Sequence, residues 1–256
     1  MKYPIILVHG VMIKDFKFFR AFGRIERALN ANGYPTYTAK IDGMGSIENN
    51  AIQLKAYILE ILKATKATRV NLIAHSKGGL DSKYMLERLE MADYVASLTT
   101  LSTPYKGSPI ASSILKLPGF IIWPVKTWFN VAYKIFGDKN PDSLTVCKEL
   151  ALKDVVEECL SIASGTYIQS YSASLKRSRD DFIMGIPRAF CKYFYKRDTD
   201  GLVDSDSSKI SNYKGMAIDE TISHTNIVDF MVGKRKREKI IAFYLKLAAE
   251  LKEMGF

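Results

Sequence analysis

The chain has 256 residues, of which 47% are hydrophobic and 25% are charged. This composition excludes a disordered, collagen-like or coiled-coil protein, and the length suits one large domain or two small ones. With 37 Lys and Arg against 27 Asp and Glu, the net charge is +10, which leaves nucleic acid, an anionic membrane and an acidic substrate open as partners because net charge governs association rather than fold.

Short β-branched runs alternate with helical patterns along the chain. Strands are predicted at Ile5–Val8, Tyr34–Ala39, Val70–Ala74, Ala96–Leu101, Thr166–Ser172 and Met216–Ile218. Helices are predicted at Phe18–Asn30, Ile47–Thr65, Gly79–Leu89 and Lys236–Met254. The alternation predicts an α/β fold in one domain, residues 1–256, with a mostly parallel central sheet flanked by helices.

The segment 107–137 departs from this alternation. It has no acidic residue and three lysines, and it holds both tryptophans of the chain. The lysines interrupt every apolar run, which excludes a transmembrane helix, and Pro118 and Pro124 are expected to break the segment into short pieces. We therefore predict an inserted lid or cap within residues 105–160.

The run from Val70 to Leu80 has the layout of a nucleophile elbow, in which a strand leads into a serine and then a helix. Ser76 lies between Ala74 and Gly78, and such small neighbours are needed where a strand and a helix pack closely around a strained turn. An incidental serine in an ordinary strand-to-helix turn is the alternative. The strand before it and the helix after it favour Ser76 as a nucleophile.

A serine hydroxyl needs a base, and the chain has only three histidines, His9, His75 and His224. His75 adjoins the serine and cannot easily turn its ring toward it, so a structural role is expected. His9 ends the first strand beside a glycine. By elimination and chain order, His224 is the predicted base.

The acid of such a triad lies between the serine and the histidine in the chain. Asp200 is the predicted acid, in a loop followed by Gly-Leu-Val, and Asp198 and Asp204 are the competitors. Two backbone N–H groups are predicted to stabilise the oxyanion. They belong to Lys77, directly after the nucleophile, and to Val11, directly after His9-Gly10.

These motifs resemble the bacterial lipase family of the α/β-hydrolase superfamily. The resemblance rests on residues 3–10, 70–79, 101–108 and 200–203 and on His224, and extends from residue 3 to about 230. It implies an α/β-hydrolase fold and a triacylglycerol lipase-like enzyme that cleaves acyl esters through Ser76, Asp200 and His224. It also implies that the inserted segment is a lid over the acyl pocket, the alternative being a fixed cap that shapes a pocket for soluble esters.

No cofactor and no metal are predicted. Several members of the family bind a structural calcium ion near the catalytic histidine, but Asn226 stands here where they have an aspartate, although Asp180 and Asp181 occupy the region of the other ligand. The three cysteines are odd in number and lack metal-binding spacing, and the N-terminus lacks a signal peptide. A cytoplasmic location is therefore expected, or a secreted one if a signal was removed.

Four other functions remain open. An esterase for short soluble esters, a thioesterase and an acyltransferase would all use the same triad. A non-catalytic module that binds a membrane or nucleic acid is suggested only by the basic run 234–239, which lacks interleaved stacking aromatics and reads better as a solvated helix start. We therefore expect an acyl ester or lipid substrate, a transient anionic lipid interface and no nucleic acid.

Overall fold

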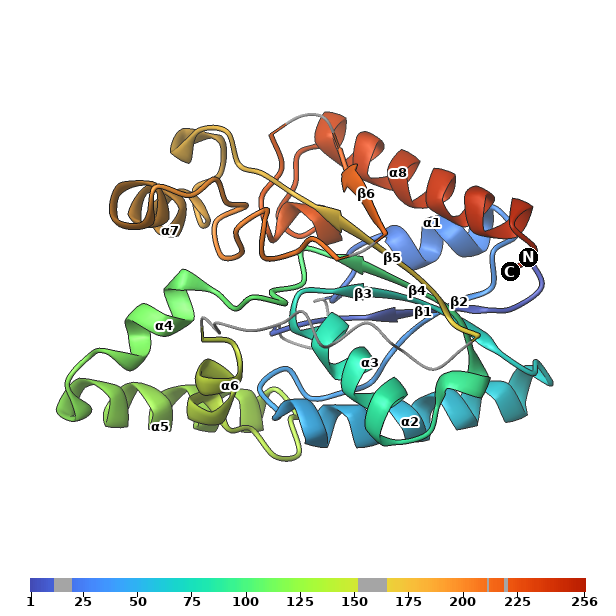
Figure 1. The fold of residues 1–256 in the computed structure, drawn as a ribbon, viewed down its shortest axis with the longest axis horizontal. Helices are drawn as coiled ribbons and strands as arrows, with labels where there is room; N and C mark the ends of the chain where they lie inside the picture. The colour runs from blue at the N-terminus through green and yellow to red at the C-terminus, as the bar shows by residue number, and fades with distance from the viewer. Residues whose placement is uncertain (12–19, 152–164, 211, 219–220) are drawn as a thin grey trace.

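A computed structural model describes residues 1–11, 20–151, 165–210, 212–218 and 221–256. Six parallel strands form one sheet with the order β2-β1-β3-β4-β5-β6 (Figure 1). The strands are β1 (Ile5–Val8), β2 (Thr36–Thr38), β3 (Val70–His75), β4 (Val95–Leu101), β5 (Tyr167–Ser172) and β6 (Tyr213–Met216). The central strands are buried on both sides, as their continuous apolar character predicts.

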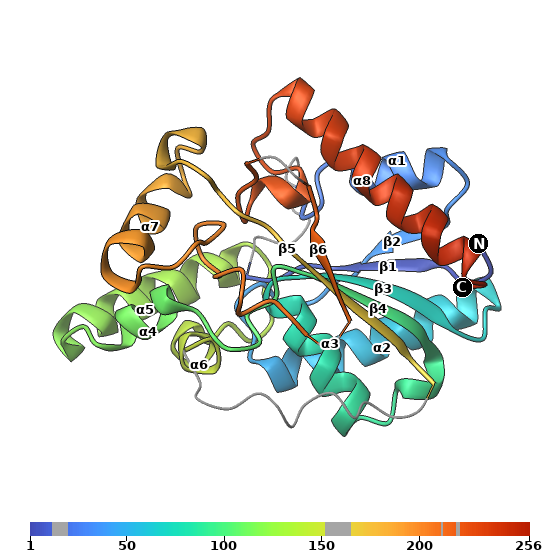
Figure 2. The same cartoon turned by 45° about the horizontal axis from the view of Figure 1, so that its top comes forward.

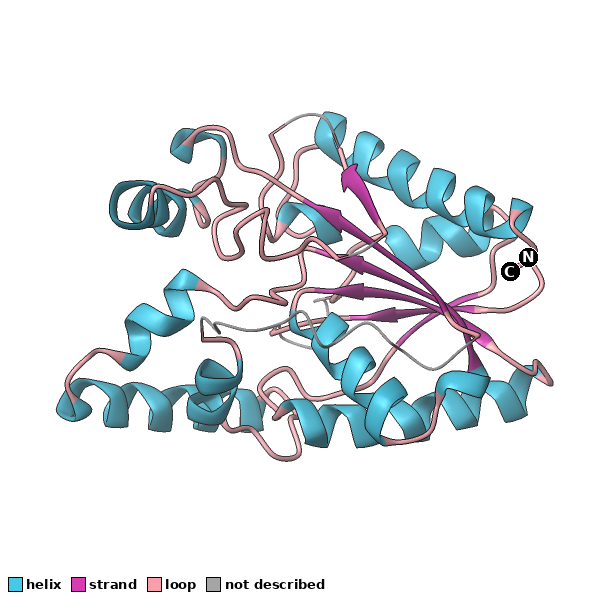
Figure 3. Ribbon diagram, in the orientation of Figure 1, coloured by secondary structure: helices cyan, strands magenta, loops and turns pink. Residues whose placement is uncertain are grey.

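Helices cover both faces of the sheet (Figure 3). Side chains of α2 (Ile47–Thr65) and α3 (Lys77–Arg88) form one core with the sheet, and those of α1 (Ile25–Ala31) and α8 (Lys234–Glu253) form the other. Successive residues of β1 alternate between these cores: Ile5 and Leu7 face α8, whereas Ile6 and Val8 face α2. The predicted fold class, a mostly parallel sheet flanked by helices, is confirmed.

The remaining helices lie beyond the ends to which the strand arrows point (Figures 1 and 2). They are α4 (Pro109–Leu115), α5 (Gly119–Ile135), α6 (Ser143–Glu149) and α7 (Gly185–Phe190). Short helical turns elsewhere in the chain are at Ala92–Tyr94, directly before β4, and at Ser178–Asp180, Cys191–Tyr195 and Asn226–Val228. Part of the inserted segment, residues 152–160, lies outside the described residues. In the described part of the chain, no helix combines the length and the apolar character needed to cross a membrane.

Two expectations about these elements were wrong. Pro124 does not end a helix but lies inside the 17-residue α5. Because that helix is exposed, the carbonyl group that loses its N–H partner to proline can be hydrated. The last strand is Tyr213–Met216 rather than Met216–Ile218, since its pairing with β5 is confined to Ser170 and Ser172.

The first predicted helix also begins later than expected. The structure has α1 at Ile25–Ala31, whereas the sequence predicted a start at Phe18. Residues 18 and 19 of that prediction lie outside the described residues. The helix at Ile47–Thr65 has the predicted bounds, and Ser46 caps it by accepting a hydrogen bond from the backbone N–H of Asn49.

Candidate active site

Ser76 occupies the sharp turn between β3 and α3, as the elbow pattern predicts. Its backbone has φ 54° and ψ −131°, a strained conformation for a residue with a side chain. The backbone N–H of Ser76 donates to the carbonyl of Leu101 in the adjacent strand β4, at 2.9 Å. The turn therefore holds the serine at the carboxyl end of the sheet with only 6% of its surface exposed.

Two glycines allow this turn to pack against the end of β1. A Cβ atom at Gly78 would lie 2.5 Å from the carbonyl oxygen of His9, and one at Gly10 would lie 2.7 Å from Cβ of Ser76. Both distances are shorter than any ordinary van der Waals contact. Close packing of the backbone therefore requires glycine at Gly10 and Gly78. For Gly78, this is the steric reason that the elbow pattern of the sequence predicts.

The structure brings Ser76, His224 and Asp200 together. Nε2 of His224 lies 2.9 Å from Oγ of Ser76, and Nδ1 lies 2.7 Å from Oδ2 of Asp200. All three side chains are buried. With the proton on Nδ1, the imidazole donates to the carboxylate and accepts from the serine hydroxyl, which is the geometry in which a serine is activated by a general base.

The loop around Asp200 distinguishes this carboxylate from its two competitors. Oδ1 of Asp200 accepts the backbone N–H groups of Leu202 and Val203, and the backbone carbonyl of Asp200 accepts the N–H of His224. Asp198 is exposed and pairs with Lys192, and Asp204 pairs with Arg197. Of the three aspartates, Asp200 is the one that contacts the histidine.

The predicted oxyanion donors lie on either side of the nucleophile. Lys77 is the first residue of α3, so its N–H is at the positive end of a helix dipole. Gly10, which precedes Val11, packs on this turn, because a Cβ atom there would lie 3.0 Å from the backbone nitrogen of Lys77. The backbone of β1 therefore ends beside the same turn, although the part that these two N–H groups play stays a prediction.

His75 packs against His224, a contact that the sequence did not reveal. The two ring centroids are 4.5 Å apart. His75 is buried, and neither ring nitrogen has a hydrogen-bond partner among the residues that the structure describes. Burial lowers the pKa of His75 well below its ordinary value, and the neighbouring His224 lowers that pKa further. A neutral ring therefore lies beside the base.

A second feature missed from the sequence is the buried ion pair beneath the elbow. Nζ of Lys77 contacts Oδ1 of Asp81 at 2.6 Å, and both side chains are fully buried. The amide of Asn50 donates to Oδ2 of Asp81 at 3.1 Å. Burial raises the pKa of Asp81 to about 6, and Lys77 opposes that rise. The ion pair lies within α3, and the hydrogen bond from Asn50 ties it to α2.

Known proteins with similar sequences and structures are mostly lipases. A family model described as lecithin:cholesterol acyltransferase matches residues 45–118, which include Ser76. A triacylglycerol lipase from Pseudarthrobacter phenanthrenivorans is 40% identical over 120 residues, covering 44% of this chain. The chain spans only 36% of that lipase. A triacylglycerol lipase from Pseudomonas fragi is 26% identical and aligns over 99% of this chain and 97% of its own.

The fold comparison covers the whole chain. The crystal structure of a Staphylococcus hyicus lipase matches with a TM-score of 0.69 and 16% identity, over 100% of this chain and 96% of that one. The chain therefore shares the fold of that lipase, an α/β-hydrolase fold with a parallel sheet flanked by helices. Ser76 of the elbow, Asp200 and His224 follow one another along the chain in the order that is typical of this fold.

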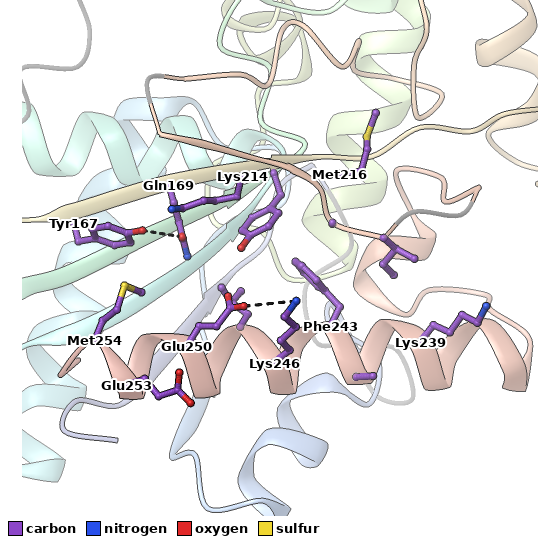
Figure 4. Close-up of a pocket in the computed structure, with 15 residues that line it drawn as sticks. Tyr167, Gln169, Lys214, Met216, Lys239, Phe243, Lys246, Glu250, Glu253 and Met254 are labelled. Carbon is purple, nitrogen blue, oxygen red and sulfur yellow. Dashed lines mark hydrogen bonds and ion pairs between the residues drawn. The ribbon is translucent and has the colours of Figure 1, made fainter.

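A groove lies at the β6 edge of the sheet, away from the triad. It has a volume of about 960 Å³ and is lined by β5, β6 and α8 (Figure 4). In Figure 4, Tyr167 donates to Gln169 at 3.1 Å, and Lys246 pairs with Glu250 across one turn of α8. None of the five predicted site residues lines this groove. The groove is therefore separate from the triad.

The residues considered from the sequence for a calcium ion, Asp180, Asp181 and Asn226, are engaged by other groups of the protein. Oδ1 of Asp181 accepts two backbone N–H groups, and Oδ2 accepts the hydroxyl of Ser223 at 2.6 Å. Oδ2 of Asp180 accepts the hydroxyl of Thr221. The amide oxygen of Asn226 accepts the ammonium group of Lys236 at 3.1 Å. Donors from the protein itself thus engage these oxygens, and among the described residues no cluster of three metal-ligating side chains occurs.

The basic run at the start of α8 is partly engaged with the body of the protein. Besides the bond from Lys236, Nε of Arg237 contacts Oδ1 of Asp229 at 2.7 Å and its Nη2 donates to the carbonyl of Val232. Asp229 in turn accepts the backbone N–H of Arg24. These contacts favour a structural use of the run, and the absence of nucleic-acid binding stays a prediction.

Proposed function

We propose that this α/β-hydrolase cleaves acyl esters of lipids, with Ser76 as nucleophile, His224 as base and Asp200 as the acid that orients the base. The observation that carries the proposal is the imidazole of His224, held 2.9 Å from the serine and 2.7 Å from the carboxylate. The similarity to triacylglycerol lipases supports a lipid ester as the substrate class.

The reaction follows from these distances. Oγ of Ser76 attacks the ester carbon while Nε2 of His224 takes the hydroxyl proton, and the backbone N–H groups of Val11 and Lys77 stabilise the oxyanion. His224 then gives the proton to the leaving alcohol, and an acyl group stays on Ser76. A water molecule loses a proton to His224 and attacks the acyl carbon, and the same proton returns to Oγ as the carboxylic acid leaves.

Covalent labelling tests the triad directly. We expect a fluorophosphonate probe to modify Ser76 alone in the wild-type protein, with labelling abolished in Ser76→Ala and strongly slowed in His224→Ala. Ser102→Ala is a matched control because Ser102 is also buried and has a positive φ, after the neighbouring strand. Labelling at another serine, or no labelling of a folded protein, would contradict the proposal.

Transfer of the acyl group to an alcohol is the second candidate function, because the acyltransferase family model matches the segment around Ser76. The acyl-serine is common to both reactions, and only the acceptor differs. Hydrolysis and transfer are separated by supplying a lipid ester with and without a long-chain alcohol and measuring free acid against new ester. A new ester formed in preference to acid in water would make transfer the main reaction.

The inserted segment is proposed to contact the lipid that carries the substrate. Helix α5 exposes both tryptophans and has no buried residue. Its C-terminal end is fixed to the body, because the carboxylate of Asp138 accepts the backbone N–H groups of Gly43 and Met44. Activity on a lipid ester that rises when the substrate forms an interface supports this contact, whereas unchanged activity would favour a fixed cap for soluble esters.

A further inference from the structure

A second exposed apolar segment lies beside the inserted one. We call residues 182–197, with α7, the α7 arm, and residues 109–135, with α4 and α5, the α5 arm. The sequence directed attention to the α5 arm only, because both tryptophans are there. In the α7 arm, Phe182 is 96% exposed and Ile186 is 78% exposed. Tyr193 and Phe194 are also exposed, on the turn that follows α7.

The exposure of the α7 arm comes from an amphipathic arrangement rather than from loose packing. Met184 and Cys191 are buried against the body, whereas Phe182 and Ile186 point to solvent. The guanidinium group of Arg188 donates to the carbonyl groups of Leu175 and Lys176. The apolar residues are therefore presented by a fixed segment, and a soluble protein seldom leaves such side chains uncovered without a partner.

The two arms meet at one end of the molecule. Oγ of Ser113 in α4 and the hydroxyl of Tyr195 in the α7 arm are 2.8 Å apart. Both views of the ribbon place α7 at the same end of the molecule as α4 and α5, beyond the carboxyl ends of the strands (Figures 1 and 2). The same end carries Ser76, and the α7 arm leads directly into the loop of Asp200. The exposed apolar side chains thus lie at the end of the molecule that carries the triad.

The charge of both arms has one sign. Residues 182–197 contain four cations and no acidic residue, and residues 107–137 contain three cations and no acidic residue. Arg188 and Arg197 are engaged with the body, which leaves Lys192 and Lys196 among the exposed aromatics of the α7 arm. Lys192 pairs with Asp198, and Lys196 lies over the ring of Tyr193. Aromatic and apolar side chains with lysines between them match the interface of an anionic bilayer.

We infer that the α7 arm and the α5 arm together form a docking surface for an anionic lipid bilayer. Apolar side chains of both arms enter the headgroup region while the lysines remain at the charged surface. This inference rests on the proposed function for the identity of the substrate, which is then an ester of a bilayer lipid that reaches Ser76 between the arms. Docking itself does not depend on the chemistry, since it uses residues outside the triad.

Vesicle binding tests the surface in a full-length Ser76→Ala background, in which no lipid is consumed. The vesicles are phosphatidylcholine alone or an equimolar mixture with phosphatidylglycerol, separated from free protein by flotation. Both tryptophans are on the α5 arm, so a blue shift of their emission reports docking of that arm while the α7 arm is varied. We expect binding and a blue shift with the anionic vesicles, and much weaker binding with the neutral ones.

The decisive variant is Phe182→Ser with Ile186→Ser. Its matched control is Ile52→Ser with Leu59→Ser, two exposed apolar residues of α2. We expect the α7-arm variant to weaken partition into anionic vesicles at least about tenfold, and the control to stay within about twofold of the parent. Lys192→Gln with Lys196→Gln should weaken partition about tenfold, with Lys63→Gln and Lys252→Gln as the control.

The outcomes separate the docking surface from the proposed function. Equal effects of the α7-arm variant and its α2 control would overturn the inference. Partition that does not depend on phosphatidylglycerol would also overturn it, and so would self-association of the protein without vesicle binding. Hydrolysis of a soluble nitrophenyl ester by the wild-type protein is measured separately. Hydrolysis without vesicle binding refutes docking alone, whereas docking without any hydrolysis refutes the esterase alone.

Discussion

The elbow and helix α5 use apolar residues in opposite ways. Every residue from Val70 to Gly79 is buried, whereas no residue of the 17-residue α5 is buried although most of them are apolar. In the elbow, Ser76 packs so closely against the backbone of β1 that Gly10 and Gly78 cannot carry a Cβ atom. Because no side chain of α5 is buried, most substitutions there should change the free energy of unfolding little. Substitutions in the elbow should therefore alter catalysis and stability, and those in α5 should alter contact with the substrate.

The strongest test of this difference is at Asp200. Asp200→Asn should reduce kcat by about 10⁴-fold while the fold is kept, because the amide no longer holds His224 in the Nδ1–H tautomer and no longer stabilises the imidazolium. The measurement is turnover of a nitrophenyl ester, with circular dichroism to check folding.

Asp198→Asn is the matched control in the same loop, since Asp198 is exposed and pairs with Lys192 rather than with the histidine. Its kcat should stay within about twofold of the wild type, because exposed ion pairs contribute little. A comparable loss of activity in both variants would mean that the loop, and not the carboxylate of Asp200, is what catalysis requires.

The ion pair beneath the elbow should produce the next largest effect, on stability. Asp81→Asn leaves the ammonium group of Lys77 buried without an anion, and we expect the free energy of unfolding at pH 8 to fall by about 3–5 kcal/mol. Urea denaturation measures this loss. The double variant Lys77→Met, Asp81→Leu should recover most of the stability, because it removes both charges.

The same helix offers the control for this ion pair. Lys83 and Glu87 are also four residues apart in α3 and 2.8 Å apart, but they are only partly buried. Glu87→Gln should cost less than about 1 kcal/mol. If Asp81→Asn cost no more than that, the buried pair would contribute nothing to holding the first turn of α3.

A glycine in each region sharpens the contrast. Gly78→Ala should lower the free energy of unfolding by about 2–3 kcal/mol, because its Cβ would lie 2.5 Å from the carbonyl oxygen of His9. Gly119→Ala, at the start of α5, meets nothing within 4 Å and should change stability by less than about 1 kcal/mol. Thermal unfolding of the two variants measures both, and equal losses would contradict the difference in packing.

The buried parts of the molecule were predicted well from the sequence, and the exposed parts less well. The elbow was predictable because only small residues fit beside Ser76 in so tight a turn. The triad was predictable because the chain has few histidines and because the fold places the acid between the serine and the histidine. The sheet was predictable because its buried strands are continuous apolar runs. Pro124 misled the prediction of α5 because hydration of an exposed helix tolerates a break that a buried helix would not. The α7 arm was missed because its apolar residues follow no period that distinguishes an exposed face from a core.

Contacts between side chains that are distant in the chain were the other limit. Nothing in the order Ala74-His75-Ser76 shows that the ring of His75 lies against His224, or that its two nitrogens find no partner within the described part of the chain. Asp81 likewise carries no local sign that it pairs with Lys77 in the interior rather than facing water. Such contacts depend on how two elements meet, which the local pattern of residues does not determine.

The smallest of the expected effects tests one of these contacts through pH. The folded protein keeps His75 neutral, with a pKa well below the ordinary value, whereas the unfolded chain takes up a proton on this ring near pH 6.5. Below that pH the unfolded state binds more protons than the folded state, so His75 lowers stability as the pH falls. The contribution is up to about 1.4 kcal/mol per pH unit.

His75→Phe removes this contribution while keeping an aromatic ring beside His224. We expect the variant to lose less stability than the wild type between pH 7 and pH 5, with parallel curves above pH 7. Because all other titrating groups are common to both proteins, the difference between their denaturation curves isolates His75. Parallel curves over the whole range would mean that water reaches the ring in the folded protein, and the neutral neighbour assigned to the base would have to be abandoned.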